Sequence, residues 1–274
     1  MADEITVKQA KDLAKEIRIK ILQMLGNFGY GHLGGSMSIA DLLGVLYSGI
    51  MNFDSSKPRW EGRDYFICSK GHAGPAVYGA LTSVGFFPET ELLKLNRLGT
   101  NLPSHCDRLR TIGVDMTTGS LGQGLSVAVG VALGIKMDEL SNYCFVVIGD
   151  GESQEGQVWE ALMFAGHNKL DKLILFIDNN GEQLDGKIFE VNKIDNYVER
   201  LKSFYWHAQL VDGHDANSII DAIKTAKSVK DCPSAIILKT IKGKGSFAEG
   251  IFNHSLPVKV SDAENDIQNL LKKN

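Results

Sequence analysis

The fold prediction for this chain starts from Tyr143-Cys144-Phe145-Val146-Val147-Ile148-Gly149-Asp150-Gly151. Its first six residues are a short apolar run typical of a buried strand, residues 172–178 form a second such run, and residues 155–169 between them fit a helix. In a β-α-β unit with the usual right-handed crossover, the two strands are parallel. Asp150 and Asn180 then both emerge at the carboxyl edge of the sheet, where they can share one ligand.

These two polar turns carry donors suited to a metal-bound diphosphate. Mg²⁺ prefers oxygen ligands and usually takes one or two protein groups together with phosphate oxygens and water. The Asp150 carboxylate, the Asn180 amide oxygen and the main-chain carbonyl of Glu182 would suffice. Gly149 and Gly151 let the backbone approach a diphosphate, and the helix that follows has free N–H groups at its positive end. The alternative is that Gly-Asp-Gly and Asn-Asn-Gly are ordinary turns.

Strands and helices alternate along the rest of the chain. The apolar spacing predicts helices at residues 7–25, 38–47, 121–136 and 216–229 and strands at residues 64–68, 207–211 and 235–240. This alternation indicates an α/β fold with three layers, αβα, around a mainly parallel sheet. Because no repeat or linker divides the chain, residues 1–274 are interpreted as a single diphosphate- and Mg-binding domain, with a less regular tail from about residue 245 and a short C-terminal helix pattern.

Composition excludes several other classes of protein. The 274 residues, 43% of them hydrophobic, suffice for one sizeable core, and the net charge of −4 comes without a basic stripe, so we expect no nucleic-acid partner. No apolar stretch approaches the roughly 20 residues of a membrane span, and Met1-Ala2-Asp3-Glu4 is acidic where a signal peptide is basic. We therefore expect a cytoplasmic protein without membrane contact, whose four scattered cysteines are reduced and mostly packed.

Four of the seven histidines lie in loops that contain glycine or proline: His32, His72, His105 and His254. Loops are where proteins commonly place catalytic residues. A single loop histidine is more often structural or solvated, so the case for function depends on the neighbouring residues.

The segments around these histidines resemble the N-terminal, diphosphate-binding half of transketolase. The resemblance starts at Gly31-His32-Leu33-Gly34-Gly35-Ser36 and runs through residues 69–75, 113–124 and 149–156 to Asp178-Asn179-Asn180-Gly181. It covers most of residues 10–245, and it is the split, two-chain form of the enzyme that this chain resembles. The resemblance implies the thiamine diphosphate-binding fold, with thiamine diphosphate and Mg²⁺ as cofactors.

The resemblance also assigns residues to the cofactor. It gives Asp150, Asn180 and the Glu182 carbonyl as the Mg²⁺ ligands, Gly151 and His72 as diphosphate contacts, and Gly119 and Leu121 as neighbours of the aminopyrimidine ring. Glu155 matches a glutamate at the subunit interface that links two cofactor sites. A first-turn glutamate favoured by the helix dipole is an equally good interpretation of Glu155.

The implied reaction moves a two-carbon ketol unit from a ketose donor to an aldose acceptor. His32 and His105 match residues that hydrogen-bond the donor sugar and relay protons, and His254 is a candidate for a third. Histidine suits this work because its ordinary pKa, about 6.5, lets it donate or accept a proton near neutral pH. The expected donor is a sugar phosphate of the pentose phosphate type, and a ketose with another anionic group is the alternative.

The resemblance further implies a separate partner chain. In the family, an activating glutamate, an aromatic clamp and most sugar-phosphate contacts belong to a pyrimidine-binding domain, which this sequence, ending at Asn274, does not contain. We therefore expect two copies of each chain in a heterotetramer that is inactive without the partner. Near the C-terminus, Phe252-Asn253-His254-Ser255 replaces the family's common His-Gly pairing.

Two alternatives compete with this interpretation. Another thiamine diphosphate enzyme, of the deoxyxylulose-phosphate synthase or 2-oxo-acid decarboxylating type, also carries Gly-Asp-Gly and a following asparagine, but His32, His105 and residues 117–124 favour transketolase. A non-catalytic diphosphate-binding scaffold is the second alternative. The complete set of Asp150, Asn180 and the histidines disfavours it.

Overall fold

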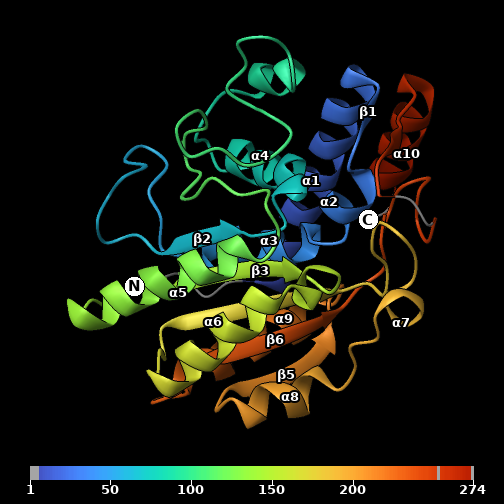
Figure 1. The fold of residues 1–274 in the computed structure, drawn as a ribbon. Coiled ribbons are helices and arrows are strands. Elements are labelled where there is room, and N and C mark those ends of the chain that lie inside the picture. The colour runs from blue at the N-terminus through green and yellow to red at the C-terminus, as the bar shows by residue number, and fades with distance from the viewer. Residues whose placement is uncertain (1–5, 252–253, 273–274) are drawn as a thin grey trace.

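A parallel five-stranded sheet, in the order β2-β3-β4-β6-β5, lies at the centre of the computed structural model (Figure 1). The model describes residues 6–251 and 254–272, so the acidic segment Met1–Glu4 and residues Phe252 and Asn253 lie outside the described parts. The strands are Tyr65–Cys68 (β2), Cys144–Gly149 (β3), Leu173–Asn179 (β4), His207–Asp212 (β5) and Ser234–Lys239 (β6). All pairings are parallel, and Gly149 of β3 lies opposite Asp178 of β4. The sequence-based prediction that these two strands end side by side is confirmed.

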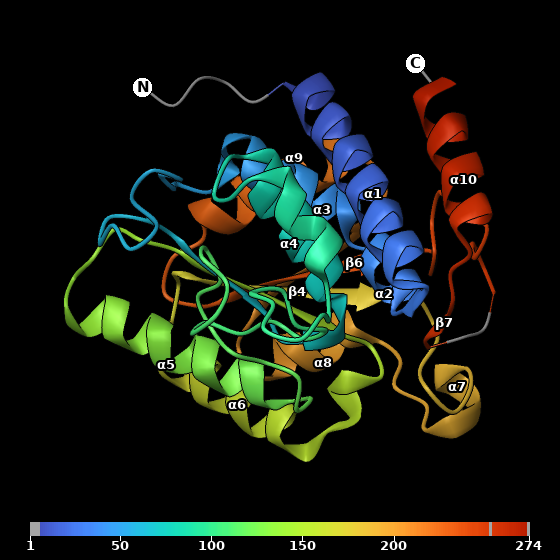
Figure 2. The same ribbon diagram turned by 90° about the horizontal axis from the view of Figure 1, so that it is seen from above.

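Helices cover both faces of the sheet and produce the three predicted layers (Figures 1 and 2). One face carries α1 (Val7–Phe28), α3 (Ala40–Val45), α4 (Gly74–Ser83) and α9 (Ala216–Ser228), and the other carries α5 (Gln123–Met137), α6 (Gly156–His167) and α8 (Tyr197–Ser203). Successive strand residues point to opposite faces, so Phe145 and Val147 join the first core whereas Val146 and Ile148 join the second. Burial on both faces explains why the strand sequences are continuously apolar.

Two features of the helical layer differ from the sequence-based expectation. In place of one helix at residues 38–47, the chain forms α2 (Leu33–Met37), α3 and a π-helical segment, η1 (Leu46–Ile50). Ile39 leaves the helical conformation between α2 and α3, with φ −102° and ψ 7°, and Gly49 in η1 has φ 128°. Helix α4 was not predicted because its residues 74–82 are all buried, which removes the polar face that makes a helix recognisable in a sequence.

The expectation that no apolar stretch approaches membrane length needs correction. Leu33–Ile50, which spans α2, α3 and η1, is 18 residues long and apolar enough to cross a membrane by length and composition alone. However, 78% of this stretch is buried inside the protein, against α1, α4 and α9. This burial is typical of a core helix.

The C-terminal segment returns to the start of the chain. Turns follow β6, and then β7 (Leu256–Pro257) pairs antiparallel with β1 (Tyr30–Gly31). Helix α10 (Val260–Lys272) packs on α1 so closely that a Cβ atom on Gly26 would lie 2.8 Å from the Ala263 side chain. The remaining short elements are α7 (Ile188–Val191), η2 (Gly71–Ala73), η3 (Glu89–Lys94) and η4 (Glu152–Gln154).

Candidate active site

The Gly149-Asp150-Gly151 turn follows β3 at the carboxyl edge of the sheet. The Asp150 side chain is buried, and its carboxylate accepts hydrogen bonds from the Gly151 N–H at 2.8 Å and from the Gly181 N–H at 2.6 Å. The second bond joins the two polar turns that the sequence places at this edge. Burial and the neighbouring Asp178 charge raise the pKa of Asp150 to about 7, so this carboxylate lacks a nearby cation that would fully offset its burial.

Asn180 and Glu182 complete the oxygen donors at this edge. The Asn180 side-chain oxygen accepts a 3.0 Å hydrogen bond from the Glu182 N–H, which leaves the Glu182 carbonyl in the same tight turn as the amide. No group of three His, Cys, Asp or Glu side chains suited to a metal occurs in the described parts of the chain. The donor set fits Mg²⁺, which needs only one or two protein groups beside phosphate and water, and it does not fit a metal with an all-protein site.

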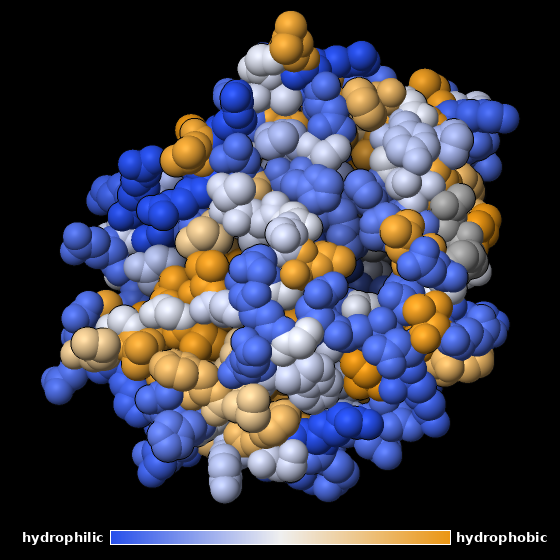
Figure 3. Space-filling model, in the orientation of Figure 1, coloured by the Kyte–Doolittle hydropathy of each residue, from blue (hydrophilic) through white to orange (hydrophobic). Residues whose placement is uncertain are grey.

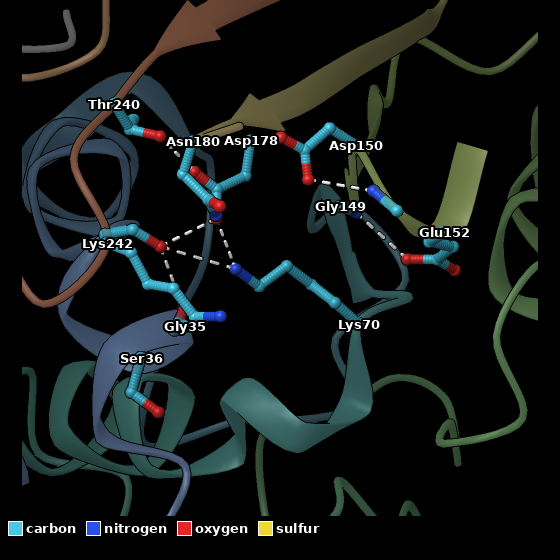
Figure 4. A network of polar contacts seen from close by, with 12 residues as sticks. Gly35, Ser36, Lys70, Gly149, Asp150, Glu152, Asp178, Asn180, Thr240 and Lys242 are labelled. Carbon is cyan, nitrogen blue, oxygen red and sulfur yellow. Dashed lines mark hydrogen bonds and ion pairs between the residues drawn. The ribbon is translucent and has the colours of Figure 1, made fainter. Parts of the chain in front are cut away.

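A buried polar network around Asp178 lies behind these donors (Figure 4). Lys70 pairs with the Asp178 carboxylate at 2.5 Å, and the hydroxyls of Ser38 and Thr240 donate to it at 2.6 and 2.5 Å. Burial alone would raise the pKa of Asp178, but the Lys70 charge and these hydrogen bonds outweigh burial and lower the pKa. The network fixes the end of β4, and through the 3.2 Å bond from the Asn180 amide to Asp178 it also orients Asn180.

Glu152 joins the Gly-Asp-Gly turn to the glycine-rich segment at residues 119–124. One of its carboxylate oxygens accepts from the Ser69 hydroxyl and from the Gly122 N–H at 2.9 Å, and the other accepts from the Gly149 N–H at 3.1 Å. Burial raises the pKa of Glu152 despite these hydrogen bonds. Glu152 had no role among the sequence-based predictions.

The four loop histidines come together at one place. Ring centroids lie 5.4 Å apart for His32 and His72, 5.6 Å for His32 and His105, 5.0 Å for His32 and His254, and 4.7 Å for His72 and His254. His254, whose place was least certain from the sequence, is thus a full member of this histidine cluster. Burial is the main cause that lowers the pKa of each ring, and for His32 burial and the neighbouring His254 and His105 lower it to about 4. All four rings are therefore neutral at pH 7.

Glycines allow the loops of the site to pack closely. Gly119, at φ +151°, lies against the His105 ring, and a Cβ atom on Gly71 would come within 2.7 Å of the Thr118 backbone. A Cβ atom on Gly151 would likewise lie 2.7 Å from Gln183. The predicted residues Gly119 and Gly151 therefore lie at close approaches that only glycine permits.

Leu121 and Glu155 lie on the outer side of the site. Both are exposed, and Glu155, at the start of α6, lies close to Gly122. In the described part of the chain neither side chain contacts the histidine cluster, and the roles expected for them, beside the aminopyrimidine ring for Leu121 and at a subunit interface for Glu155, stay predictions.

Two buried lysines give the site positive charge. Lys70 is neutralised by Asp178, whereas Lys242 lies 3.6 Å from the Glu182 carboxylate and packs over Gly34. Burial lowers the pKa of Lys242. Neither lysine was among the residues predicted from the sequence, although Lys70 stands directly before the Gly71-His72 motif.

Fold and site together define a cofactor-binding α/β domain, in which polar turns and histidines meet at the carboxyl edge of a parallel sheet. A family model described as "Transketolase, thiamine diphosphate binding domain" matches residues 9–271, and the chain belongs to this family. The transketolase resemblance and the thiamine diphosphate-binding fold are confirmed.

Relatives and solved structures agree with the family. The chain is 52% identical over 86% of its length to a protein of Clostridium sp. (strain MSTE9) named "6-deoxy-6-sulfo-D-fructose transketolase subunit SqwG", of which it also covers 86%. It is 38% identical to a transketolase of Pongo abelii over 89% of this chain but only 38% of that one. Transketolase structures from Pichia stipitis and Leishmania mexicana superpose with a TM-score of 0.89 at 31% and 30% identity, covering 97% and 95% of this chain and 41% of each of theirs. The chain thus corresponds to one part of the longer transketolases and is a transketolase subunit.

Proposed function

We propose that this chain is the diphosphate-binding subunit of a transketolase that transfers a two-carbon ketol unit from a ketose to an aldose. The observation that carries the proposal is the cluster of His32, His72, His105 and His254, with centroid separations of 4.7–5.6 Å between the pairs in contact. Four neutral imidazoles beside a diphosphate-type turn can hydrogen-bond a sugar's hydroxyl and carbonyl oxygens and move protons between them. A scaffold that binds only diphosphate has no need for such a cluster.

Thiamine diphosphate and Mg²⁺ are the cofactors that the residues fit. Thiamine diphosphate supplies a thiazolium carbon for cleavage of the bond next to a ketose carbonyl. Asp150, Asn180 and the Glu182 carbonyl would hold Mg²⁺, and the Gly151 backbone and His72 would contact the diphosphate. Lys242 adds a buried positive charge at the same edge of the sheet, which complements the negative charge of a diphosphate.

A separate pyrimidine-binding chain completes the enzyme in this proposal. Apolar side chains gather over α5 and α6 (Figure 3), where Met137, Met163 and Phe164 are 74%, 48% and 47% exposed. Gly130 and Gly134 on α5 also have open space beside them, which lets another chain approach the helix closely. Leu121 and Glu155 are exposed and stand just before α5 and α6, in keeping with the proposal that Glu155 lies at a subunit interface. We propose an assembly of two such chains with two partner chains in the cytoplasm.

The donor sugar is proposed to carry an anionic group. One candidate donor is a sugar phosphate of the pentose phosphate type. The second candidate is a sulfonated ketose, because the relative from Clostridium, which is 52% identical to this chain, is named for 6-deoxy-6-sulfo-D-fructose. Both donors share the ketose carbonyl and the hydroxyl groups that the histidine cluster can bind. They differ in the anionic group at the end of the sugar distant from the carbonyl, which is a phosphate in one and a sulfonate in the other.

Co-expression with the candidate partner chain tests the proposal. With thiamine diphosphate and Mg²⁺ present, two-carbon transfer to ribose 5-phosphate is measured from xylulose 5-phosphate and, in parallel, from 6-deoxy-6-sulfo-D-fructose. We expect transfer from at least one donor, and only when both chains are present. Consumption of pyruvate in place of ketose cleavage would favour another thiamine diphosphate enzyme, and cofactor binding without any turnover would favour a scaffold.

A further inference from the structure

A separate cavity of about 670 Å³ lies at the amino end of β2, away from the histidine cluster. The loop at residues 57–63, which leads into β2, and the loop at residues 108–115 form its walls. Tyr65 at the start of β2 lines the cavity, whereas Lys70 and His72 follow the opposite, carboxyl end of that strand. None of the candidate active-site residues is part of the lining, and the volume is that of a small-molecule pocket.

The lining of this cavity is strongly positive. It contains five cationic side chains, Lys57, Arg59, Arg63, Arg108 and Arg110, and a single acidic one, Asp115. The whole chain, in contrast, has a net charge of −4. Figure 3 shows strongly hydrophilic side chains gathered where these two loops lie in Figure 1. A concave surface with one sign of charge concentrates ligands of the opposite sign.

Acidic neighbours offset part of this charge but do not match it, because Arg63 and Arg108 both act on Asp115. The Asp115 carboxylate forms an ion pair with Arg63, with 2.7 Å between Oδ1 and Nη2, and accepts a hydrogen bond from the Phe66 N–H at 2.9 Å. Within residues 6–251 and 254–272, the side chains of Arg59 and Arg108 form no hydrogen bond or ion pair, although the Arg108 charge partly offsets the rise that burial causes in the pKa of Asp115. Arg110 lies 3.9 Å from Asp107. Guanidinium groups bind phosphate oxygens with paired hydrogen bonds, so these arginines are suited to a phosphorylated ligand.

An aromatic wall adjoins these arginines. The Trp60 indole is 42% exposed and lies against Gly62, where a Cβ atom would come within 2.6 Å of the ring. Arg63 donates to the Trp60 carbonyl at 3.1 Å and stacks 4.5 Å above the Tyr65 ring, which fixes this side of the cavity. A positioned indole beside arginines offers a planar surface for a flat ring that bears phosphate.

We propose that this cavity is a nucleotide-binding site, with the phosphates on Arg59, Arg108 and Arg110 and the base on Trp60. The proposal goes beyond the proposed transketolase function and does not depend on it. Binding here would use none of the groups assigned to thiamine diphosphate.

Calorimetry with ATP tests the site in the full chain, first saturated with thiamine diphosphate and excess Mg²⁺ so that the diphosphate site is filled. We expect saturable binding of one ATP per chain. An Arg59→Gln/Arg108→Gln double variant should bind at least about tenfold more weakly, since each removes a charge-assisted contact. The matched control, Arg97→Gln/Arg200→Gln, removes the same charge from exposed positions elsewhere and should bind ATP as the wild type does.

The proposed contact between Trp60 and the base is tested separately. Trp60→Ala should weaken ATP binding while leaving the affinity for inorganic tripolyphosphate unchanged, and circular dichroism checks that each variant is folded. Absence of saturable ATP binding, or an equal loss in the control pair, would overturn the site. Tripolyphosphate binding as tight as ATP binding to the wild type would overturn its assignment to a nucleotide.

Discussion

Asp150 is the side chain on which metal and cofactor binding should depend most. It is buried, it accepts hydrogen bonds from both polar turns, and it is the one carboxylate among the three donors assigned to Mg²⁺. We predict that Asp150→Ala abolishes Mg²⁺-dependent binding of thiamine diphosphate in calorimetry. Asp185→Ala, which removes an exposed carboxylate from the loop after β4, should bind normally. Tight binding by Asp150→Ala would remove Asp150 from the site.

His105 and His72 should have separable roles although both belong to the histidine cluster. His105 is half-buried beside Gly119, whereas His72 is more deeply buried, next to Gly35. We predict that His105→Ala lowers turnover of the donor by roughly 10²–10⁴-fold, the usual effect of a positioned acid–base group, with little change in cofactor affinity. His72→Ala should weaken cofactor binding. An equal loss of cofactor affinity and turnover in His105→Ala would place His105 outside the sugar site.

The site residues that could be predicted from the sequence are those whose adjacent residues form a recognisable motif. His32 and His72 stand in glycine-rich motifs and His105 follows Pro103, and the structure brings all three together with His254. Lys70, Asp178 and Glu152 were missed because their roles come from partners distant in sequence. Lys70 and Asp178 are separated by 108 positions, and Ser69 and Glu152 by 83. A buried lysine becomes recognisable only when the fold supplies its carboxylate.

The strands were easier to predict than these contacts because each strand has a signal of its own in the sequence. A buried parallel strand is a continuous apolar run, so β3 and β4 are visible in the sequence. Helix α4, which is buried on all sides, and the division of residues 33–50 into α2, α3 and η1 have no comparable signal. They depend on packing against distant segments.

The end of β4 should owe much of its stability to the Lys70–Asp178 pair. Asp178→Asn keeps the size of the side chain but leaves the buried Lys70 ammonium without a counter-charge. We predict that this variant loses about 3–5 kcal/mol of unfolding free energy in urea, the usual cost of breaking a buried pair from one side. Asp195→Asn, which breaks exposed pairs with Lys193 and Arg200, should change little.

A second substitution separates the loss of the charge pair from a general packing defect. Adding Lys70→Met to Asp178→Asn removes the unpaired ammonium and should restore part of the lost free energy. If the double variant is as unstable as the sum of the single variants, the Lys70–Asp178 interaction does not account for the effect.

At the scale of the whole molecule, the site exists because distant parts of the chain meet. The pairing of β1 with β7 brings the ring centroid of His254 to 5.0 Å from that of His32, although 222 positions separate the two residues. No periodicity in the sequence predicts such a return, so the position of His254 was the least predictable part of the site. The cluster therefore forms only when the segments at β1 and β7 have paired.

The histidine cluster should make the stability of the folded chain depend on pH. Burial, nearby histidines and the Lys70 and Lys242 charges lower the pKa values of the cluster, to about 4 for His32, whereas an unfolded histidine titrates near pH 6.5. Between these values the histidines bind more protons in the unfolded chain, so their contribution to stability should rise with pH from about 4 to about 6.5. Asp150, whose pKa is raised to about 7 in the folded chain, contributes a slope of the opposite sign. Urea unfolding without cofactor should show the histidine contribution to the slope reduced in a His32→Gln/His105→Gln/His254→Gln variant and retained in His167→Gln. An identical slope in the wild type and the triple variant would contradict the lowered pKa values.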